Sequence, residues 1–310
     1  MLENIPKISV LVICYKQENV IRRAMDSLIA QKDYIYEICI NDDKSPDKTW
    51  EILLEYQAKY PDLVKPVRND PNLFIFANIE ATWKRPTGNL IYQLSGDDEV
   101  PDGYFKHVCE FVKEKGLDCD NDNFCIYGDY EQVEPSGVHF YFSNKKIIKY
   151  DPIMLKTRSL ISNRSACFSI GVLRSFIPVS DGRSYAVEHA QDGQLQLFSK
   201  KNYYIPYSGN IYYSSIGVSV SMNPQIALER AEEIDNKTVE FFERLNINLS
   251  FSTKHYLSFM RYYNRFKFTK SKISLLLMMY HYILSLDFSL GFDSLLLGNF
   301  LRKIRKKIKK

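Results

Sequence analysis

The chain has 310 residues, of which 45% are hydrophobic and 25% charged, so its composition excludes a disordered protein and fits one large domain or a domain with an appendage. The formal net charge is only +4, yet residues 251–310 hold 13 of the 41 Lys and Arg residues and two of the 37 acids. A mildly acidic body with a basic tail predicts that the tail meets an anionic surface. None of the six cysteines belongs to a CxxC pair, and we expect buried, reduced thiols.

Strand and helix patterns alternate over the first 115 residues. Residues 8–14 (ISVLVIC) form a nearly continuous apolar run, which is typical of a strand buried on both faces. Apolar residues then recur at helical spacing over 18–31. The alternation continues with strands at 37–40, 64–67 and 89–94 and with helices after Pro46, over 74–84 and over 101–115. This order predicts an α/β fold with a mainly parallel sheet and helices on both faces.

The pattern changes after Phe124. Strand patterns occupy 124–133, 138–148 and 202–213, and helical patterns occupy 188–199 and 224–245. The residues that follow are helical and basic. We therefore expect one domain over 1–220 and a helical extension over 221–310.

Acidic residues follow two of the predicted strands. Asp42 and Asp43 come after the second strand, and Asp97, Asp98 and Glu99 come after the fourth. Ligands of parallel sheets sit at the carboxyl ends of the strands. Neighbouring carboxylates repel one another, and a hard divalent cation such as Mn²⁺ or Mg²⁺ would offset that repulsion and bridge them to a diphosphate.

Simpler interpretations of these acids exist. Asp42 and Asp43 could cap the next helix, although Ser45 followed by Pro46 already supplies an N-cap and a first-turn proline. The acids at 97–99 could complement a helix dipole, for which one acid would suffice. Neither GxGxxG nor GxxxxGK[ST] occurs, which argues against a dinucleotide dehydrogenase or a P-loop NTPase.

Three segments, ISVLVICYKQE, EICINDDKSPDKTWEIL and LIYQLSGDDEVPDGYF, resemble in their order and spacing the family 2 inverting glycosyltransferases of the GT-A fold. The resemblance is close over residues 6–110, loose from 160 to 220 and absent from the tail. It implies a Rossmann-like GT-A sheet, mixed but mainly parallel, with helices on both faces and a helical C-terminal extension.

The resemblance also implies a nucleotide site. Tyr15, in the loop after the first strand, would lie beside the nucleotide of the donor. Asp42 and Asp43 match the family's paired aspartates, one of which binds the uracil or the ribose.

Asp97 and Asp98 match the family's "DxD" region, which binds the metal and the donor diphosphate. Ser95 stands where the family has its first aspartate. The metal ligand therefore stays open among Asp97, Asp98 and Glu99, with Asp98 favoured.

The family carries a Glu-Asp pair at the head of a helix in its second half, and the aspartate is the catalytic base. Gln191 and Asp192 in EHAQDGQLQLF match that pair, with Gln in place of Glu. Asp192 is the implied base, and Glu188 and His189 are rivals within one helical turn.

The tail has the pattern of a basic amphipathic helix. From Leu297 onward one face is apolar and the others carry Lys and Arg; the apolar residues are Phe300, Leu301, Ile304 and Ile308. Such a helix lies in the plane of an anionic membrane surface, although a solvated tail is a simpler interpretation. The start lacks the features of a signal peptide, so we expect a cytoplasmic protein attached peripherally to the inner face of the membrane. No nucleic-acid module is recognisable, and we expect no such partner.

These patterns support two hypotheses. The first is a metal-dependent inverting glycosyltransferase that moves a sugar from a nucleotide diphosphate donor, a UDP-sugar, to a glycan or lipid-linked glycan in bacterial surface polysaccharide synthesis. The second is a catalytically silent subunit that binds a nucleotide sugar and docks a partner enzyme at the membrane.

Overall fold

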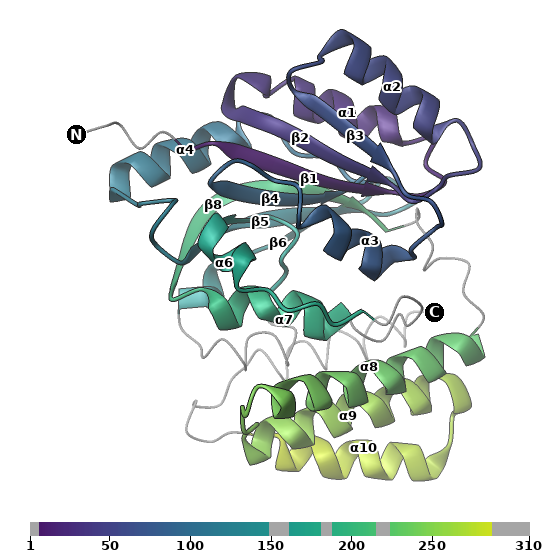
Figure 1. Ribbon diagram of the computed structural model, residues 1–310. Helices are drawn as coiled ribbons and strands as arrows, with labels where there is room; N and C mark the ends of the chain where they lie inside the picture. The colour runs from purple at the N-terminus through teal and green to yellow at the C-terminus, as the bar shows by residue number, and fades with distance from the viewer. Residues whose placement is uncertain (1–5, 149–160, 181–187, 215–223, 287–310) are drawn as a thin grey trace. The chain divides into compact units, whose positions relative to one another are not determined.

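The computed structural model describes residues 6–148, 161–180, 188–214 and 224–286 (Figure 1). The chain divides into two compact units, Met1–Asn248 and Leu249–Lys310. The helix α8 (Pro224–Arg244), which the sequence analysis assigned to the extension, belongs to the first unit.

Four parallel strands form the first half of the sheet, in the order β3-β2-β1-β4. The strands are β1 (Ile8–Cys14), β2 (Ile35–Asp42), β3 (Val64–Arg68) and β4 (Leu90–Ser95). The helices between and after them are α1 (Ile21–Ile29), η1 (Lys32–Tyr34), α2 (Thr49–Lys59), α3 (Ile75–Thr82) and α4 (Tyr104–Lys115). The predicted strand–helix alternation is confirmed.

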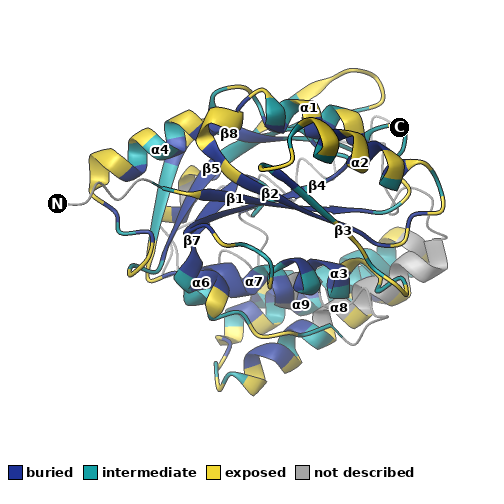
Figure 2. Cartoon of the chain, turned by 45° about the horizontal axis from the view of Figure 1, so that its top comes forward, coloured by how far each residue is buried: buried dark blue, intermediate teal, exposed yellow. Residues whose placement is uncertain are grey.

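The core lies on both faces of β1, whose seven residues are all buried (Figure 2). Val10 and Val12 pack in one cluster with apolar residues of α1, α2 and α4. Leu11 packs in a second cluster with residues of later helices, and Ile13 packs with α3. Because successive side chains of a strand point to opposite faces, this apolar run needs helices on both sides.

The second half makes the sheet mixed. Its strands are β5 (Phe124–Val133), β6 (His139–Phe142), β7 (Ala166–Ser169) and β8 (Lys201–Tyr213). Its helices are η2 (Lys145–Ile148), α6 (Ile170–Arg174) and α7 (Glu188–Phe198). Strand β7 lies antiparallel between β4 and β5, whereas β8 runs parallel to β5 along its other edge.

The strands observed in the second half of the sheet differ from the sequence prediction at two places. Strand β7, with only four residues, was not predicted, because so short a run carries little periodicity. The strand expected over 138–148 ends at Phe142, and the η2 turn follows it. All six cysteines are free, and only Cys109 among them is not fully buried, which confirms the expectation of buried thiols for the other five.

The second unit contains the helical hairpin of α9 (Phe251–Thr269) and α10 (Lys272–Leu284). Ser250 and Ser271 cap the two helices by accepting hydrogen bonds from the backbone N–H groups of Thr253 and Ser274. Among the described residues, no helix combines the length and the hydropathy that crossing a bilayer requires. The predicted tail from Leu297 onward lies outside the described residues.

Glu37 is a buried carboxylate of β2 that ties neighbouring segments together. It accepts hydrogen bonds from Ser9 Oγ (2.7 Å), from the Thr87 backbone N–H (2.5 Å) and from Lys65 Nζ (2.7 Å). Burial raises the pKa of Glu37, but these hydrogen bonds outweigh burial and lower it to about 2. A lowered folded-state pKa means that ionised Glu37 stabilises the fold above about pH 4.5, and that this contribution is lost as the pH falls toward 2.

We expect Glu37→Gln to lower the free energy of unfolding by roughly 3 kcal/mol at pH 7 and by clearly less near pH 3, because at pH 3 the carboxyl of the unfolded chain is protonated and the pH is only about one unit above the folded-state pKa. Urea unfolding at the two pH values measures the difference. Glu114→Gln, at a largely exposed carboxylate of α4, is the matched control and should change little. An equal loss at both pH values would contradict the assignment.

Candidate active site

The carboxyl ends of β1, β2 and β4 meet at one edge of the sheet. Cys14 pairs with Asp42, and Ile13 pairs with Ser95. The strand pairing continues into the loops, since the N–H of Asp43 donates to Cys14 O (3.0 Å) and the N–H of Gly96 to Ile13 O (2.9 Å). Three loops that are far apart in the sequence therefore lie together.

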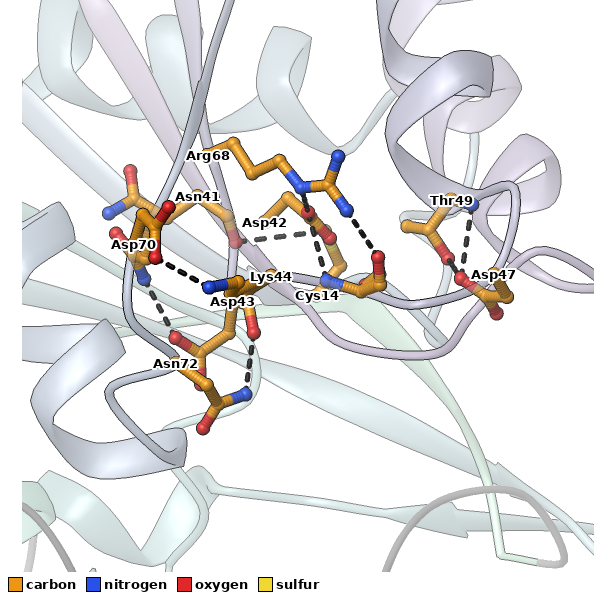
Figure 3. Close-up of polar contacts among 12 residues, drawn as sticks. Cys14, Asn41, Asp42, Asp43, Lys44, Asp47, Thr49, Arg68, Asp70 and Asn72 are labelled. Atoms are coloured by element: carbon orange, nitrogen blue, oxygen red, sulfur yellow. Dashed lines mark hydrogen bonds and ion pairs between the residues drawn. The ribbon is translucent and has the colours of Figure 1, made fainter.

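Asp42 is fully buried and holds the loop that follows β2 (Figure 3). Its Oδ2 accepts a hydrogen bond from the Ser45 N–H (3.1 Å) and forms an ion pair with Arg68 Nε (3.3 Å). Burial raises the pKa of Asp42, and the bonds from Ser45 and the charge of Arg68 oppose that rise. Asp42 thus joins β3 to the β2–α2 loop.

Asp43 performs the same task for the loop before α3. Its Oδ1 accepts hydrogen bonds from the Leu73 N–H (2.7 Å) and from Asn69 Nδ2 (2.8 Å), and Asn72 donates to its backbone carbonyl (Figure 3). Asp43 is only 2% exposed. Both predicted nucleotide-binding aspartates are therefore at the edge of the sheet, where their carboxylates hold its loops.

The loop after β1 is joined to the loop after β2. The N–H of Lys16 donates to Ser45 Oγ (3.0 Å), and the N–H of Gln17 donates to Thr49 Oγ1 (2.8 Å). Lys16 and Lys44 both have positive φ, 57° and 59°, an uncommon conformation for residues other than glycine that often marks functional loops. Tyr15 lies half-buried in this loop, with Lys16 Nζ 5.2 Å from the centre of its ring.

The predicted cap of the next helix was wrong. Helix α2 begins at Thr49, and Ser45 does not cap it. The N-cap position is Lys48, and Asp47 before it accepts hydrogen bonds from the Thr49 N–H (3.1 Å) and from Thr49 Oγ1 (2.6 Å). The hydroxyl of Ser45 instead receives the N–H of Lys16.

Two of the three acids after β4 are bound by arginines. Arg164 Nη1 lies 3.0 Å from Asp98 Oδ2, and the same oxygen accepts from Asn210 Nδ2 (3.4 Å). Arg23 Nε lies 2.8 Å from Glu99 Oε1. Both acids therefore hold a cation supplied by the chain itself.

Each arginine also lies over a tyrosine of β8. Arg23 lies 3.6 Å from the centre of the Tyr213 ring, and Arg164 lies 3.8 Å from that of Tyr212. The Tyr213 hydroxyl donates to Glu99 as well (2.6 Å). Planar guanidinium groups favour such stacked, charge-paired positions.

Of these four side chains, Arg23 and Arg164 were not predicted as part of the site, and Tyr212 and Tyr213 were left without an assigned role. They come from α1, from the loop before β7 and from β8, and no local pattern connects them with the acids. The signal that the sequence did offer was the triplet itself, because three adjacent acids need nearby cations.

Asp97 is the member of the triplet that has no ion pair among the described residues. Its side chain is half-buried, and burial raises its pKa. Gly96 lets this loop approach the first one closely, since a Cβ there would lie 2.4 Å from Gln17 Oε1 and 3.1 Å from Cys14 Cβ. Asp98 is 2% exposed, and its burial raises its pKa to about 6 although Arg164 lowers it.

Helix α7 carries the predicted base. Asp192 is half-buried, and its backbone carbonyl accepts a hydrogen bond from Asn163 Nδ2 (2.8 Å). Asn163 precedes Arg164, the partner of Asp98, so one short loop contacts both α7 and the acid triplet. The side chains of the rivals Glu188 and His189 lie outside the described part of the structure.

Gln191, which precedes the predicted base, is buried and structural. Its Nε2 donates to Phe76 O (3.3 Å) and to Glu80 Oε1 (3.4 Å), and both partners belong to α3. Within the described ranges, no three His, Cys, Asp or Glu side chains gather as a metal-binding group.

The chain is similar in sequence and in fold to known proteins. Residues 9–175 match the family described as "Glycosyl transferase family 2". The putative glycosyltransferase EpsE of Bacillus subtilis is 31% identical over 93 residues, which are 30% of this chain and 34% of EpsE. The chondroitin synthase of Pasteurella multocida is 27% identical over 204 residues, which are 63% of this chain and 19% of the synthase. In both relatives the aligned segment covers a minor part of the protein.

Solved structures are similar in fold. The crystal structure of S. aureus TarS superposes with a TM-score of 0.60 at 17% identity, covering 89% of this chain and 48% of TarS. Its 1–349 fragment in complex with UDP-GlcNAc gives 0.58 at 16% identity, covering 89% of this chain and 79% of the fragment. The mixed sheet and its helices are thus those of a GT-A fold. With the family match extending over more than half of its residues, the chain belongs to glycosyl transferase family 2.

Proposed function

We propose that this glycosyltransferase moves a sugar, with inversion at the anomeric carbon, from a UDP-sugar to a glycan or lipid-linked glycan during the synthesis of a bacterial surface polysaccharide. The family supports sugar transfer. TarS, which shares the fold, binds UDP-GlcNAc, and relatives in the family include a chondroitin synthase. The observation that carries the proposal is the loop of Asn163 and Arg164, which contacts both the helix of the candidate base and the acid triplet.

The donor nucleotide would lie at the loops after β1 and β2. Tyr15 is half-buried there and offers an aromatic face, and Asp42 and Asp43 remain the candidates for the base or the ribose. Because both carboxylates already hold neighbouring loops, we expect their main effect on the donor to come through the shape of those loops.

The acid triplet fits a divalent cation through Asp97. Oδ2 of Asp98 and Oε1 of Glu99 are occupied by Arg164 and Arg23, whereas Asp97 is half-buried, makes no ion pair among the described residues and has a pKa raised by burial. Mn²⁺ or Mg²⁺, bound by Asp97 and a diphosphate, would supply positive charge for the leaving group. Asp98, favoured from the sequence, is the weaker candidate in this geometry.

Asp192 would act as the general base. As the acceptor hydroxyl oxygen attacks the anomeric carbon, the Asp192 carboxylate takes its proton. The bond between that carbon and the diphosphate oxygen breaks on the opposite face, and the diphosphate leaves with the electron pair. The hydrogen bond from Asn163 to the Asp192 carbonyl fixes the helix turn that carries the base.

A catalytically silent, donor-binding subunit is the alternative. Its motivation was Ser95 and Gln191, where the family has acids. The contacts of Gln191 weaken the argument for a silent subunit, because its amide binds α7 to α3. Gln191 thus has a structural role, and Asp192 remains next to it on the same helix.

The two functions differ in donor turnover. We would incubate the full chain with UDP-, GDP- and dTDP-sugars and Mn²⁺, measuring thermal shift and free nucleotide. A donor at 100 times its dissociation constant adds about 2.7 kcal/mol of stability. The proposal expects a UDP-sugar to stabilise the chain and to release UDP, with release lost in Asp192→Asn. Stabilisation without any UDP release would instead establish the silent subunit.

A further inference from the structure

The hairpin of α9 and α10 carries cations and no acids. Between residues 249 and 286 the sequence has six Lys and Arg residues and neither Asp nor Glu. Lys270 and Lys272, at the turn between the helices, are exposed. This part of the chain is therefore uniformly basic, in contrast to the acidic triplet and paired aspartates of the first unit.

Helix α10 is apolar on two opposite faces. One face packs against α9, where Met278 is buried in a cluster with Tyr256 and Phe259. The residues of the other face are each between 51% and 70% exposed; they are Ile273, Leu276, Met279, Tyr280 and Ile283. These positions recur at three- and four-residue spacing, so they form one continuous stripe along the helix. Lys272 falls on the same side of the helix at its first turn.

Exposure of such an apolar stripe to water is unfavourable, and the helix is too short to span a bilayer. Contiguous exposed apolar residues of this number mark an interaction site. A spanning helix needs about 20 apolar residues, whereas α10 has 13. An apolar face combined with cations and no acids is the pattern of a helix lying at the surface of an anionic bilayer.

We propose that α10 docks the protein on an anionic membrane surface, with its exposed apolar stripe inserted among the lipid headgroups and acyl chains and with the lysines of the hairpin turn on the phosphates. The charge of the hairpin decides between the possible occupants. A second copy would bring the same cations against these, whereas anionic lipid complements them. This inference goes beyond the proposed transfer reaction and does not depend on it.

The test uses the full chain, sedimented with phosphatidylcholine vesicles with or without 25% phosphatidylglycerol. The double variant Leu276→Gln/Ile283→Gln should reduce binding to anionic vesicles at least tenfold. Leu54→Gln/Val67→Gln, at exposed apolar residues of the first unit, is the matched control and should bind as the wild type does. At 1 M salt the Debye length falls to about 3 Å, and the attraction between the lysines and the lipid phosphates is screened. The binding that the wild type retains at this salt concentration then reports the apolar stripe, and it should vanish in the double variant.

A second measurement separates α10 from the basic tail. Tryptophan fluorescence of Tyr280→Trp should be quenched by lipids brominated on their acyl chains. In Tyr141→Trp, whose new tryptophan lies on the exposed face of β6, the quenching should not exceed that of the wild type. The proposal is overturned if the Tyr280→Trp signal is unchanged on anionic vesicles, or if the double variant sediments like the wild type. It is equally overturned if the double variant abolishes a dimer in light scattering while vesicle binding persists.

Discussion

Asp192→Asn should leave UDP-sugar affinity within about twofold of wild type and reduce sugar transfer by about 10²–10⁴, the range of general base catalysis. Asparagine keeps the size of the side chain but cannot accept the acceptor's proton. The backbone carbonyl of residue 192, which holds the helix turn through Asn163, is unchanged by the substitution. The fold and the donor site should therefore survive.

The measurement is UDP release under saturating donor, together with donor affinity by calorimetry. Gln191→Glu is a useful companion, since it restores the family's acid beside the base and should retain measurable transfer. Near-normal turnover in Asp192→Asn would move the base to Glu188 or His189, and the same substitution test then applies to each.

The second large effect concerns the acid triplet. Asp97→Asn should remove the Mn²⁺-dependent part of donor affinity, a loss of at least about tenfold, with little change in stability, because its half-buried carboxylate makes no ion pair among the described residues. Asp98→Asn should weaken donor binding less, by releasing Arg164. Calorimetric titration of donor with and without Mn²⁺ compares the two. If only Asp98→Asn loses the Mn²⁺ dependence, Asp98 is the ligand, as the sequence suggested.

Asp98 also has a distinctive effect on stability. Its pKa is raised to about 6, so the protonated form stabilises the fold below about pH 4, and this contribution is lost as the pH rises through 6. Ionised Asp98 then opposes folding by roughly 3 kcal/mol at pH 7. Asp98→Asn should therefore be at least as stable as wild type at pH 8, with the gap narrowing toward pH 4. A marked loss of stability at pH 8 would show that the pair with Arg164 is structural.

Glu37 and Asp98 show how two buried acids can be told apart. Glu37 has its pKa lowered to about 2 by several hydrogen bonds, and its charge stabilises the sheet. Asp98 keeps a raised pKa despite its arginine, and its charge opposes folding. A charge that lowers stability at a strand end points to function, because natural sites give up stability for activity.

The parallel half of the fold could be predicted because its signals are local. The buried run of β1 and the helical spacing that follows it depend only on neighbouring residues. Strand β7 was missed since its four residues gain their place from pairing with β4 and β5, which lie far away in the sequence. Ser45 was misjudged as a cap because a serine before proline fits the pattern, whereas Asp47 stands closer to the start of the helix.

The candidate site was predictable in its acids and not in their partners. Asp97, Asp98 and Glu99 stand out in the sequence because they are adjacent. Arg164 is 66 positions from Asp98, and Asn210 is 112 positions away. Only the folded sheet brings such residues together, so the sequence could not show that two of the three acids form ion pairs with arginines.

The configuration of the sugar that the enzyme releases tests inversion by Asp192 most directly. With UDP-GlcNAc, Mn²⁺ and water as the acceptor, proton NMR would record the first anomer to form before mutarotation. We expect the β-anomer from the α-linked donor, because a single base directs attack to the face opposite the leaving diphosphate, and we expect its formation to be lost in Asp192→Asn. Initial release of the α-anomer, at a rate that Asp192→Asn leaves unchanged, would contradict inversion by this base.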